Sequence, residues 1–205
     1  GINDTADRST PVTTFAGGTN WKSVSSGYLH SAAIKTDGTL WTWGRNAEGQ
    51  LGINLTSART TPVTTFAGGT NWKSVDCGYN HTLSIKTDGT LWVWGLNDYG
   101  QLGINTTTDR SNPVTTFAGG TNWNSVSSGC FASQIGIGGR YTTAIKTDGT
   151  LWTWGRNAEG QLGIGVTTNR TTPVTTSAGG TNWKSVAGGE LYTVAIPSGL
   201  NVDFS

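Results

Sequence analysis

One block of sequence occurs four times along this chain, and this repetition limits the folds that are open to it. The pentapeptide Gly-Gly-Thr-Asn-Trp ends at Trp21, Trp72, Trp123 and Trp183, so successive copies are 51, 51 and 60 residues apart. A period of about 50 residues is typical of repeat architectures, in which each copy forms one supersecondary unit and neighbouring copies share a core. The third copy is nine residues longer than the others, and we place this insertion at about residues 130–138.

Each copy contains four short segments in which β-branched and aromatic residues alternate with others, a pattern that predicts β-strands. In the first copy these segments are residues 11–14, 21–24, 30–35 and 40–43, and we expect one sheet in this order. Asp37-Gly38 joins the last two segments. An Asp-Gly pair between strands predicts a hairpin with a type I′ turn, because both central positions of that turn need a positive φ.

Four strands in about 50 residues predict the blade of a β-propeller. The expected fold is therefore all-β, with one propeller-type domain over residues 1–205 and repeats at about 8–58, 59–109, 110–169 and 170–205. The fourth copy departs from the pattern after Ile196, as a terminal repeat does. The opening Gly-Ile-Asn also occurs inside later copies, so we expect a processed or trimmed parent chain. The copies form a complete small ring, part of a larger ring, or an open arc docked on another protein.

Pairs of tryptophans lie two residues apart in the fourth predicted strand. Trp41 and Trp43 point to one face of the sheet, because side chains alternate along a strand. We expect these rings to fill the space between adjacent blades; stacking on carbohydrate is the alternative. The same pair occurs in the next two copies, at Trp92 and Trp94 and at Trp152 and Trp154.

The charge of the chain argues against several classes of partner. The net charge is +1 and only 12% of residues are charged, so the clustered basic excess that binds nucleic acid or anionic membranes is absent. No apolar run approaches the roughly 18 residues of a membrane span. We therefore predict neither a nucleic-acid partner nor a membrane partner.

No residue pattern predicts a metal site. Cys77 and Cys130 stand outside any Cys-x-x-Cys pair or Cys/His cluster. We expect two free buried thiols, with a disulfide between neighbouring blades as the alternative.

Histidine and tyrosine alternate at one repeat position. His30 and His81 occupy this position in the first two copies, and Tyr141 and Tyr192 occupy it in the others. Tyrosine is a poor substitute for a histidine ligand. We therefore expect a structural hydrogen bond to neighbouring backbone at this position.

The sequence gives no sign of catalysis. Glu48 and Glu159 lie in the same loop of different copies. We therefore do not expect their carboxylates to lie within the roughly 5–10 Å that glycoside hydrolysis needs. No serine–histidine–acid pattern stands out. We predict a chain without enzymatic activity and without a cofactor.

Candidate binding residues lie where the copies differ. The insertion carries apolar residues, and extra residues in one repeat often map to a loop on a binding face. The alternative is that they fill the propeller channel or cap a gap. The second copy also has Asp-Tyr where the first and third have Ala-Glu. The candidates are Phe131, Gln134, Ile135, Ile137, Arg140, Asp98 and Tyr99.

Three motifs resemble the regulator of chromosome condensation repeat family. They are Cys77-Gly78-x-x-His81-Thr82, Leu91-Trp92-x-Trp94-Gly95 and Asn97-x-x-Gly100-Gln101-Leu102-Gly103. The resemblance implies a propeller, usually of seven blades, whose ring is closed by strands from both chain ends. The founding member of the family is a nuclear nucleotide-exchange factor for a small GTPase that also binds chromatin. That activity is not carried over, because its binding loops and basic tail have no match here.

The near-identity of the copies is similar to versions of the repeat in bacterial surface proteins and bacteriophage virion proteins. We therefore expect a non-catalytic interaction or structural module of a virion appendage or surface assembly, located on a virion, outside the cell or at the cell surface. Its partners would be other subunits of that assembly, or a host receptor or glycan. The alternative is a lectin-like, carbohydrate-binding propeller. A GTPase-regulating or enzymatic propeller is the third hypothesis.

Overall fold

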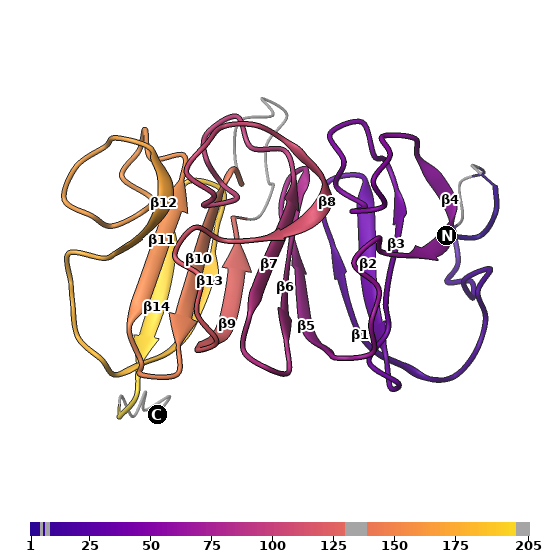
Figure 1. Cartoon of the computed structure of the whole chain (residues 1–205), viewed down its shortest axis with the longest axis horizontal. Coiled ribbons are helices and arrows are strands. Elements are labelled where there is room, and N and C mark those ends of the chain that lie inside the picture. Colours follow the sequence, from indigo (N-terminus) through magenta and orange to yellow (C-terminus); the bar gives the residue numbers. More distant parts are fainter. Residues whose placement is uncertain (5, 7–8, 130–138, 200–205) are drawn as a thin grey trace.

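The computed structural model describes residues 1–4, 6, 9–129 and 139–199. In this part of the chain, fourteen β-strands form three four-stranded sheets and one two-stranded sheet, and no helix occurs. The sheets follow one another along the chain as blades 1 to 4 (Figure 1). The prediction of an all-β propeller built from about four blades is confirmed.

Consecutive strands within each blade are antiparallel neighbours. Blade 1 contains β1 (Trp21–Ser26), β2 (His30–Lys35), β3 (Leu40–Gly44) and β4 (Arg59–Thr64). Blade 2 contains β5 (Trp72–Cys77), β6 (His81–Lys86), β7 (Leu91–Gly95) and β8 (Arg110–Thr115). Blade 3 contains β9 (Trp123–Ser128), β10 (Tyr141–Lys146), β11 (Leu151–Gly155) and β12 (Arg170–Thr175). The described part of blade 4 contains β13 (Trp183–Gly188) and β14 (Thr193–Pro197).

The grouping of the strands differs from the expectation in one respect. The sequence pattern predicts that the proline-containing segment opens each sheet. In the structure this segment closes the sheet of the preceding copy, because β4, which contains Pro62, pairs with β3. Residues 11–14 form no strand. The edge position suits Pro62, since proline has no N–H to donate to a further strand.

The Asp-Gly hairpin is confirmed, but its turn is not of type I′. Of the two residues, only Gly38 has a positive φ, at 79°. The Gly38 N–H donates to the Lys35 carbonyl at 2.9 Å, and the Lys35 N–H donates to the Thr39 carbonyl at 3.0 Å. These bonds define a type I turn followed by a left-handed glycine. The hydroxyl and N–H of Thr39 donate to the Asp37 carboxylate, at 2.7 and 2.9 Å, and hold the pKa of Asp37 below its usual value.

The space between consecutive blades is filled by aliphatic side chains of one blade and by tryptophans of the next. Between blades 2 and 3, an aliphatic layer that includes Leu83 faces Trp123 and Trp154. Trp154 is fully buried, and its indole N–H donates to the Gln101 carbonyl of blade 2 at 2.9 Å. Trp94 contacts blade 1 in the same way. The prediction that the tryptophan pairs occupy the interblade space is confirmed at these two interfaces.

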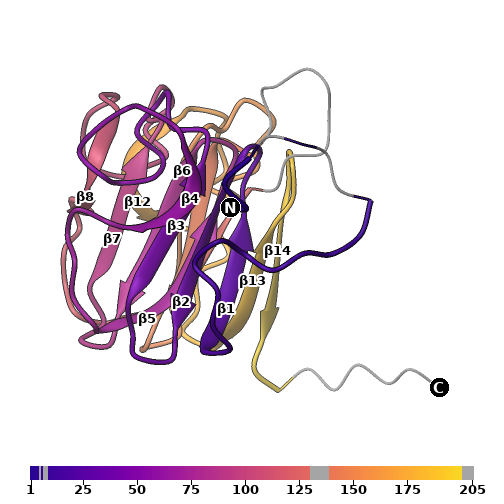
Figure 2. The ribbon, with the colours of Figure 1, turned by 90° about the vertical axis from the view of Figure 1, so that its right-hand side faces the viewer.

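The described residues form an open arc of blades (Figures 1 and 2). Val75 packs against blade 1, whereas its equivalent in blade 1, Val24, is 69% exposed. Ile85 is fully buried toward blade 3, whereas its equivalent in blade 4, Ile196, is 44% exposed. Both terminal blades therefore have an uncovered apolar face, and the described residues do not close a small four-bladed ring.

Buried histidines link adjacent blades. His30 Nε2 lies 2.9 Å from Thr82 Oγ1 of blade 2, and His81 Nε2 lies 3.3 Å from Thr142 Oγ1 of blade 3. The Thr82 hydroxyl donates a hydrogen bond to the Gln50 carbonyl, so its oxygen accepts a hydrogen bond from His30 Nε2–H. The expected bond to neighbouring backbone is therefore wrong for the histidines, whose partner is a hydroxyl group of the next blade.

The same position in blade 3 has a different partner. The Tyr141 hydroxyl donates to the Gly189 carbonyl of blade 4 at 3.0 Å. The backbone partner expected from the sequence is confirmed for this tyrosine. All three side chains connect one blade to the next. The repeat position therefore has one structural role, which is filled by an imidazole–hydroxyl contact in two blades and by a phenol–carbonyl bond in the third.

Mild acid should destabilise the chain through its histidines. Burial lowers the pKa of His30 from 6.5 to about 4, and burial and the nearby His30 lower that of His81 to about 3. The unfolded chain therefore binds these protons first as the pH falls. We expect the free energy of unfolding to fall by about 1 kcal/mol per pH unit for each histidine between about pH 6.5 and 5. Urea titrations at fixed pH measure this slope. His81→Gln should halve it, and an unchanged slope would assign the effect to other groups.

In blades 1 and 2, a glycine after the third strand lies close to the interblade tryptophan of the next blade. A Cβ added to Gly103 would lie 2.8 Å from Trp154 Nε1, and φ at this residue is +63°. Gly163 is its equivalent in blade 3 and has a φ of +62°, but a Cβ there would meet no atom within 4 Å. The two glycines share a backbone conformation and differ in the tryptophan contact.

This pair allows a matched test of interblade packing. We expect Gly103→Ala to lower the free energy of unfolding by about 3 kcal/mol, from left-handed strain and a clash with the indole. Gly163→Ala should cost only about 1 kcal/mol, because it adds the strain alone. Urea denaturation of both variants measures the difference, and equal losses would show that the tryptophan contact does not limit this position.

Candidate functional site

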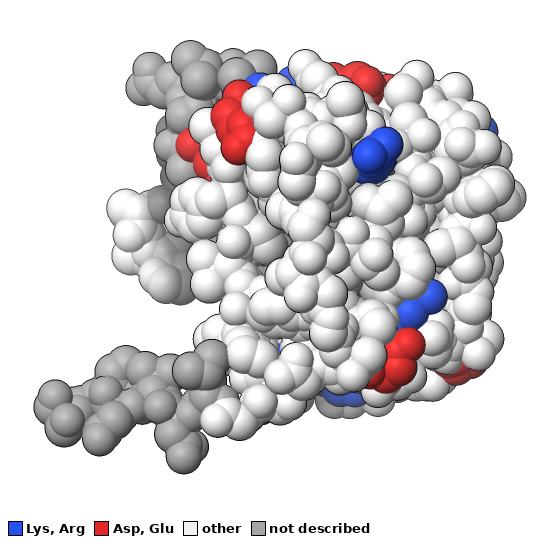
Figure 3. All heavy atoms as spheres, turned by 90° about the vertical axis from the view of Figure 1, so that its left-hand side faces the viewer, with Lys and Arg blue, Asp and Glu red and all other residues white. Residues whose placement is uncertain are grey.

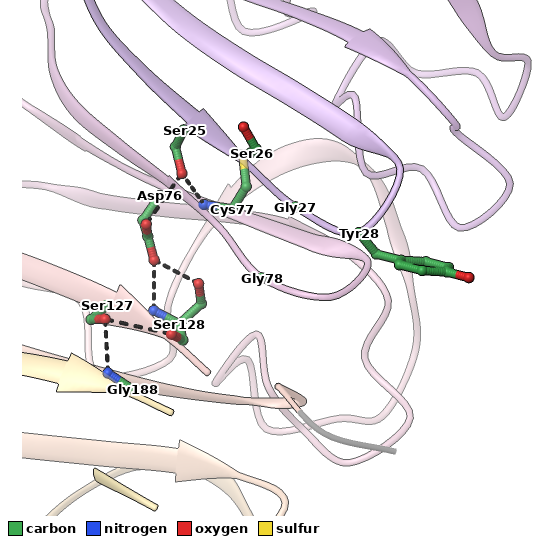
Figure 4. A pocket seen from close by; sticks show the side chains of 10 residues that line it. All are labelled: Ser25, Ser26, Gly27, Tyr28, Asp76, Cys77, Gly78, Ser127, Ser128 and Gly188. Carbon is green, nitrogen blue, oxygen red and sulfur yellow. Dashed lines mark hydrogen bonds between the residues drawn. The ribbon is translucent and has the colours of Figure 1, made fainter. Parts of the chain in front are cut away.

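A pocket of about 320 Å³ lies where the first strands of the blades end (Figure 4). These strands lie side by side along the inner side of the arc, because β1 contacts β5, β5 contacts β9 and β9 contacts β13. The pocket wall therefore draws equivalent positions from successive blades. Its lining residues are Ser25, Ser26, Gly27, Tyr28, Asp76, Cys77, Gly78, Ser127, Ser128 and Gly188.

Asp76 connects three of these strands through its carboxylate. Its Oδ1 accepts a hydrogen bond from the Ser25 hydroxyl of β1 at 3.2 Å. Its Oδ2 accepts bonds from both the N–H and the hydroxyl of Ser128 in β9, each at 2.6 Å. The Ser25 hydroxyl oxygen also accepts the Cys77 N–H at 3.0 Å. The carboxylate is thus a structural acceptor that joins blades 1, 2 and 3.

Cys77 lies beside this network as a buried free thiol. Burial, and secondarily the Asp76 carboxylate, raise the pKa of the thiol to about 12. The thiol is therefore protonated at neutral pH and a poor nucleophile. The expectation of a free buried thiol is confirmed for Cys77, whereas Cys130 lies outside the described residues.

Three tyrosines and two arginines stack on one another beside the pocket, and we call them the tyrosine–arginine cluster. The rings of Tyr28 and Tyr79 stack with centroids 4.8 Å apart. The guanidinium of Arg140 lies 5.3 Å from the ring centroid of Tyr79 and 5.6 Å from that of Tyr99. Arg156 lies 5.8 Å from the Tyr99 centroid. Guanidinium groups at these distances from aromatic faces make cation–π contacts, so the cluster is a continuous stack across blades 1 to 3.

Tyr99 reaches this cluster through a compensated change in the repeat. In blade 1, the Gln50 amide donates to the Glu48 carboxylate at 3.0 Å. Blade 2 has Tyr99 at the position of Glu48, and there the Gln101 amide donates to Asp98 at 3.0 Å instead. The neighbouring carboxylate therefore preserves the loop, and position 99 becomes available for an aromatic ring.

The structure brings together three of the sequence-predicted site residues. The Arg140 guanidinium forms an ion pair with Asp98 and lies over the Tyr99 ring. The other four candidates, Phe131, Gln134, Ile135 and Ile137, lie outside the described residues. A binding role for the set stays a prediction.

Sequence reasoning missed Asp76, Tyr28 and Tyr79. Asp76 is a single acid at a position where the first and third copies have serine. Both tyrosines stand two residues before a histidine, in a Gly-Tyr-x-His pattern that only the first two copies share. Comparing the copies residue by residue would have exposed these signals.

The described residues contain few elements of reactive chemistry. Among them, no three His, Cys, Asp or Glu side chains gather in a group that could hold a metal ion. The same part of the chain has no helix of the length and apolar character needed to cross a membrane. The arrangement offers aromatic faces, guanidinium groups and hydroxyl groups, which are suited to binding.

Removing the Asp76 carboxylate should loosen the inner strands. We expect Asp76→Ala to lower the free energy of unfolding by about 2 kcal/mol, because the half-buried hydroxyl of Ser25 and the buried donors of Ser128 lose their acceptor. Asp76→Asn keeps one acceptor oxygen and should lose about 1 kcal/mol. Urea denaturation distinguishes the two, and wild-type stability of the alanine variant would show that the network contributes nothing.

Comparisons with known proteins agree with this architecture. A family model described as the regulator of chromosome condensation (RCC1) repeat matches residues 37–85, 88–145 and 148–196. A second model of the same repeat matches residues 21–50, 72–101 and 132–161. The chain is 36% identical over 177 residues to the ultraviolet-B receptor UVR8 of Arabidopsis thaliana, covering 85% of this chain and 38% of UVR8. It is 32% identical over 167 residues to HERC4 of Rattus norvegicus, covering 80% of this chain and 15% of HERC4.

The solved structures show the same fold. The crystal structure of Prp20p from Saccharomyces cerevisiae superimposes with a TM-score of 0.72 at 20% identity, covering 86% of this chain and 43% of Prp20p. The chain thus spans less than half the length of each of these three proteins. Because the repeat models match most of its length, the chain belongs to the regulator of chromosome condensation (RCC1) repeat family.

Proposed function

We propose that this chain is a non-catalytic, protein-binding part of an RCC1-type propeller, and that the tyrosine–arginine cluster contacts the partner. The observation that supports this proposal is the stack of tyrosine rings and guanidinium groups beside the pocket. Tyrosine and arginine are enriched at protein interfaces and among the residues that dominate binding energy. Tyr28, at the start of the stack, is 41% exposed.

The arginines of the cluster are neutralised by carboxylates, so we expect the partner to be recognised by its shape and by aromatic contacts. Arg140 pairs with Asp98, and Arg156 pairs with Glu159. The hydrogen bond from Arg156 lowers the pKa of Glu159, so this carboxylate stays ionised at neutral pH. With both cations matched by carboxylates, the surface carries little net charge to attract a polyanion.

One relative supports a protein as the partner. Prp20p, which shares this fold, is described with its binding properties to Gsp1p and histones. That description concerns Prp20p alone, and the identity between the two chains is only 20%. It supports the class of partner and leaves its identity open.

We further propose a virion appendage or a surface assembly as the setting, on the basis of the near-identical copies. The relatives named above, from a plant, a rat and a yeast, lend this setting no support. Immunogold labelling of native particles and cells tests it, and label confined to the cell interior would contradict it. Glycan binding, the alternative, stays a prediction.

Cross-linking from the cluster should capture the partner. p-Benzoylphenylalanine in place of Tyr28 should form a cross-link in the native assembly, whereas the same residue in place of Phe117, which is 66% exposed, should not. With the captured protein purified, Tyr79→Ala should weaken binding by about 30-fold, the effect of losing one strong interface residue. Phe117→Ala is the control. Equal binding of the two variants would overturn the proposed role of the cluster.

A further inference from the structure

One position of the repeat forms the same interblade hydrogen bond in three blades. In blade 1, the hydroxyl oxygen of Ser25 accepts the Cys77 N–H of blade 2 at 3.0 Å. In blade 3, the hydroxyl oxygen of Ser127 accepts the Gly188 N–H of blade 4 at 3.1 Å. In blade 2 the acceptor is the Asp76 carboxylate, which accepts an N–H of β9 at 2.6 Å. A serine hydroxyl is therefore sufficient for the fold at this position, and the negative charge of Asp76 is additional.

The added charge has no cationic partner within the described residues. The ion pairs of that part of the chain join arginines to Glu48, Asp98 and Glu159. The Asp76 carboxylate is bonded there by hydroxyl and N–H donors, with one hydrogen bond to Oδ1 and two to Oδ2. Each carboxylate oxygen offers about two lone pairs. Oδ1 can therefore accept a further hydrogen bond.

Asp76 lines the pocket of about 320 Å³ and is the one charged side chain among the described residues that line it. Figure 4 shows its carboxylate between Ser25 and Ser128, with the ring of Tyr28 pointing away from them. Pockets that bind drug-sized molecules have volumes of roughly 300–1,000 Å³. A volume at the lower end of this range suits a single side chain. The pocket therefore presents a carboxylate and hydroxyl groups to a small cationic group.

The charge of Asp76 is not part of a generally charged surface. Only 12% of the residues of this chain are charged. On the face of the arc that Figure 3 shows, charged side chains form small, separate groups among uncharged residues. A carboxylate without a cationic partner thus distinguishes this pocket from its surroundings.

We propose that the pocket binds an arginine side chain of the protein partner, with the guanidinium group donating to Asp76. This inference rests on the proposed function, because it names a side chain of that partner. A guanidinium group carries five N–H donors, and the pocket offers it the carboxylate and the Ser26 hydroxyl as acceptors. Arginine is enriched at protein interfaces, whereas lysine is depleted. Tyr28 lines the pocket and belongs to the tyrosine–arginine cluster, so a partner that covers the cluster also reaches the pocket.

Two peptides that differ in charge test the chemistry. Acetyl-Gly-Arg-Gly-amide and its citrulline counterpart have nearly the same shape, but the citrulline side chain is neutral. Nuclear magnetic resonance titrations of the full chain, followed at the amides of Gly27, Gly78 and Gly188, measure both affinities. We expect saturable binding of the arginine peptide and about 10-fold weaker binding of the citrulline peptide, the effect of losing one charged hydrogen bond. Equal binding of the two peptides, or no binding of the arginine peptide, would overturn the proposal.

Asp76→Ser provides a variant that removes the charge and keeps the interblade acceptor found in blades 1 and 3. It should be more stable than Asp76→Ala and should bind the arginine peptide about 10-fold more weakly than the unmodified chain. Asp88→Asn is the matched control, because it removes one negative charge from an exposed turn beside Asn71, at the opposite end of β5. This variant should bind the peptide normally. Equal losses in the two variants would show general electrostatic attraction and contradict a specific pocket.

Binding of the captured partner distinguishes this inference from the proposed function. We expect Asp76→Ser to weaken partner binding about 10-fold, and Tyr79→Ala to leave binding of the arginine peptide unchanged. A loss of partner affinity in Tyr79→Ala without a loss in Asp76→Ser would overturn the arginine pocket and preserve the role of the cluster. The reverse result would overturn the role of the cluster and preserve the pocket.

Discussion

The packing of tryptophans against the aliphatic layer of the preceding blade is the interaction on which the rest of the structure depends. A four-stranded sheet of this size cannot bury both of its faces alone, so each blade gains its core from its neighbours. The indole of Trp154 satisfies this need twice, by filling the interblade space and by donating to the Gln101 carbonyl. The close approach of the ring requires Gly103, and left-handed glycines therefore recur with the tryptophans.

Two departures from the repeat lie beside the pocket lined by Ser25, Asp76 and Ser128. Asp76 replaces a serine and connects three strands, while Tyr99 replaces a glutamate whose structural role passes to Asp98. Each change preserves the hydrogen bonds of the fold and alters what the surface presents. The blades therefore share their interblade tryptophans and differ at the surface beside the pocket, where the tyrosine–arginine cluster lies.

Much of this architecture could be predicted from the sequence, because period, alternation and Asp-Gly turns are local signals. The strands, the propeller class and the interblade position of Trp94 and Trp154 follow from them. The grouping of strands could not be predicted, since alternating residue types identify a strand but do not show which strand pairs with it. The histidine partners were missed for the same reason, because Thr82 is 52 residues from His30. Asp98, Tyr99 and Arg140 were selected as differences among copies, but only the fold shows that they meet.

The assignment of the proline strand to the preceding blade has a consequence for how such chains change in length. The unit that is copied in the sequence, from one proline segment to the next, is out of phase with the unit that folds, since β4 belongs to blade 1 and yet opens the second copy. Neighbouring copies are interlocked as a result. Gaining or losing one whole copy changes the number of blades and leaves every internal sheet intact. Recombination between near-identical copies can thus add or remove a blade, and each resulting chain still forms complete internal sheets.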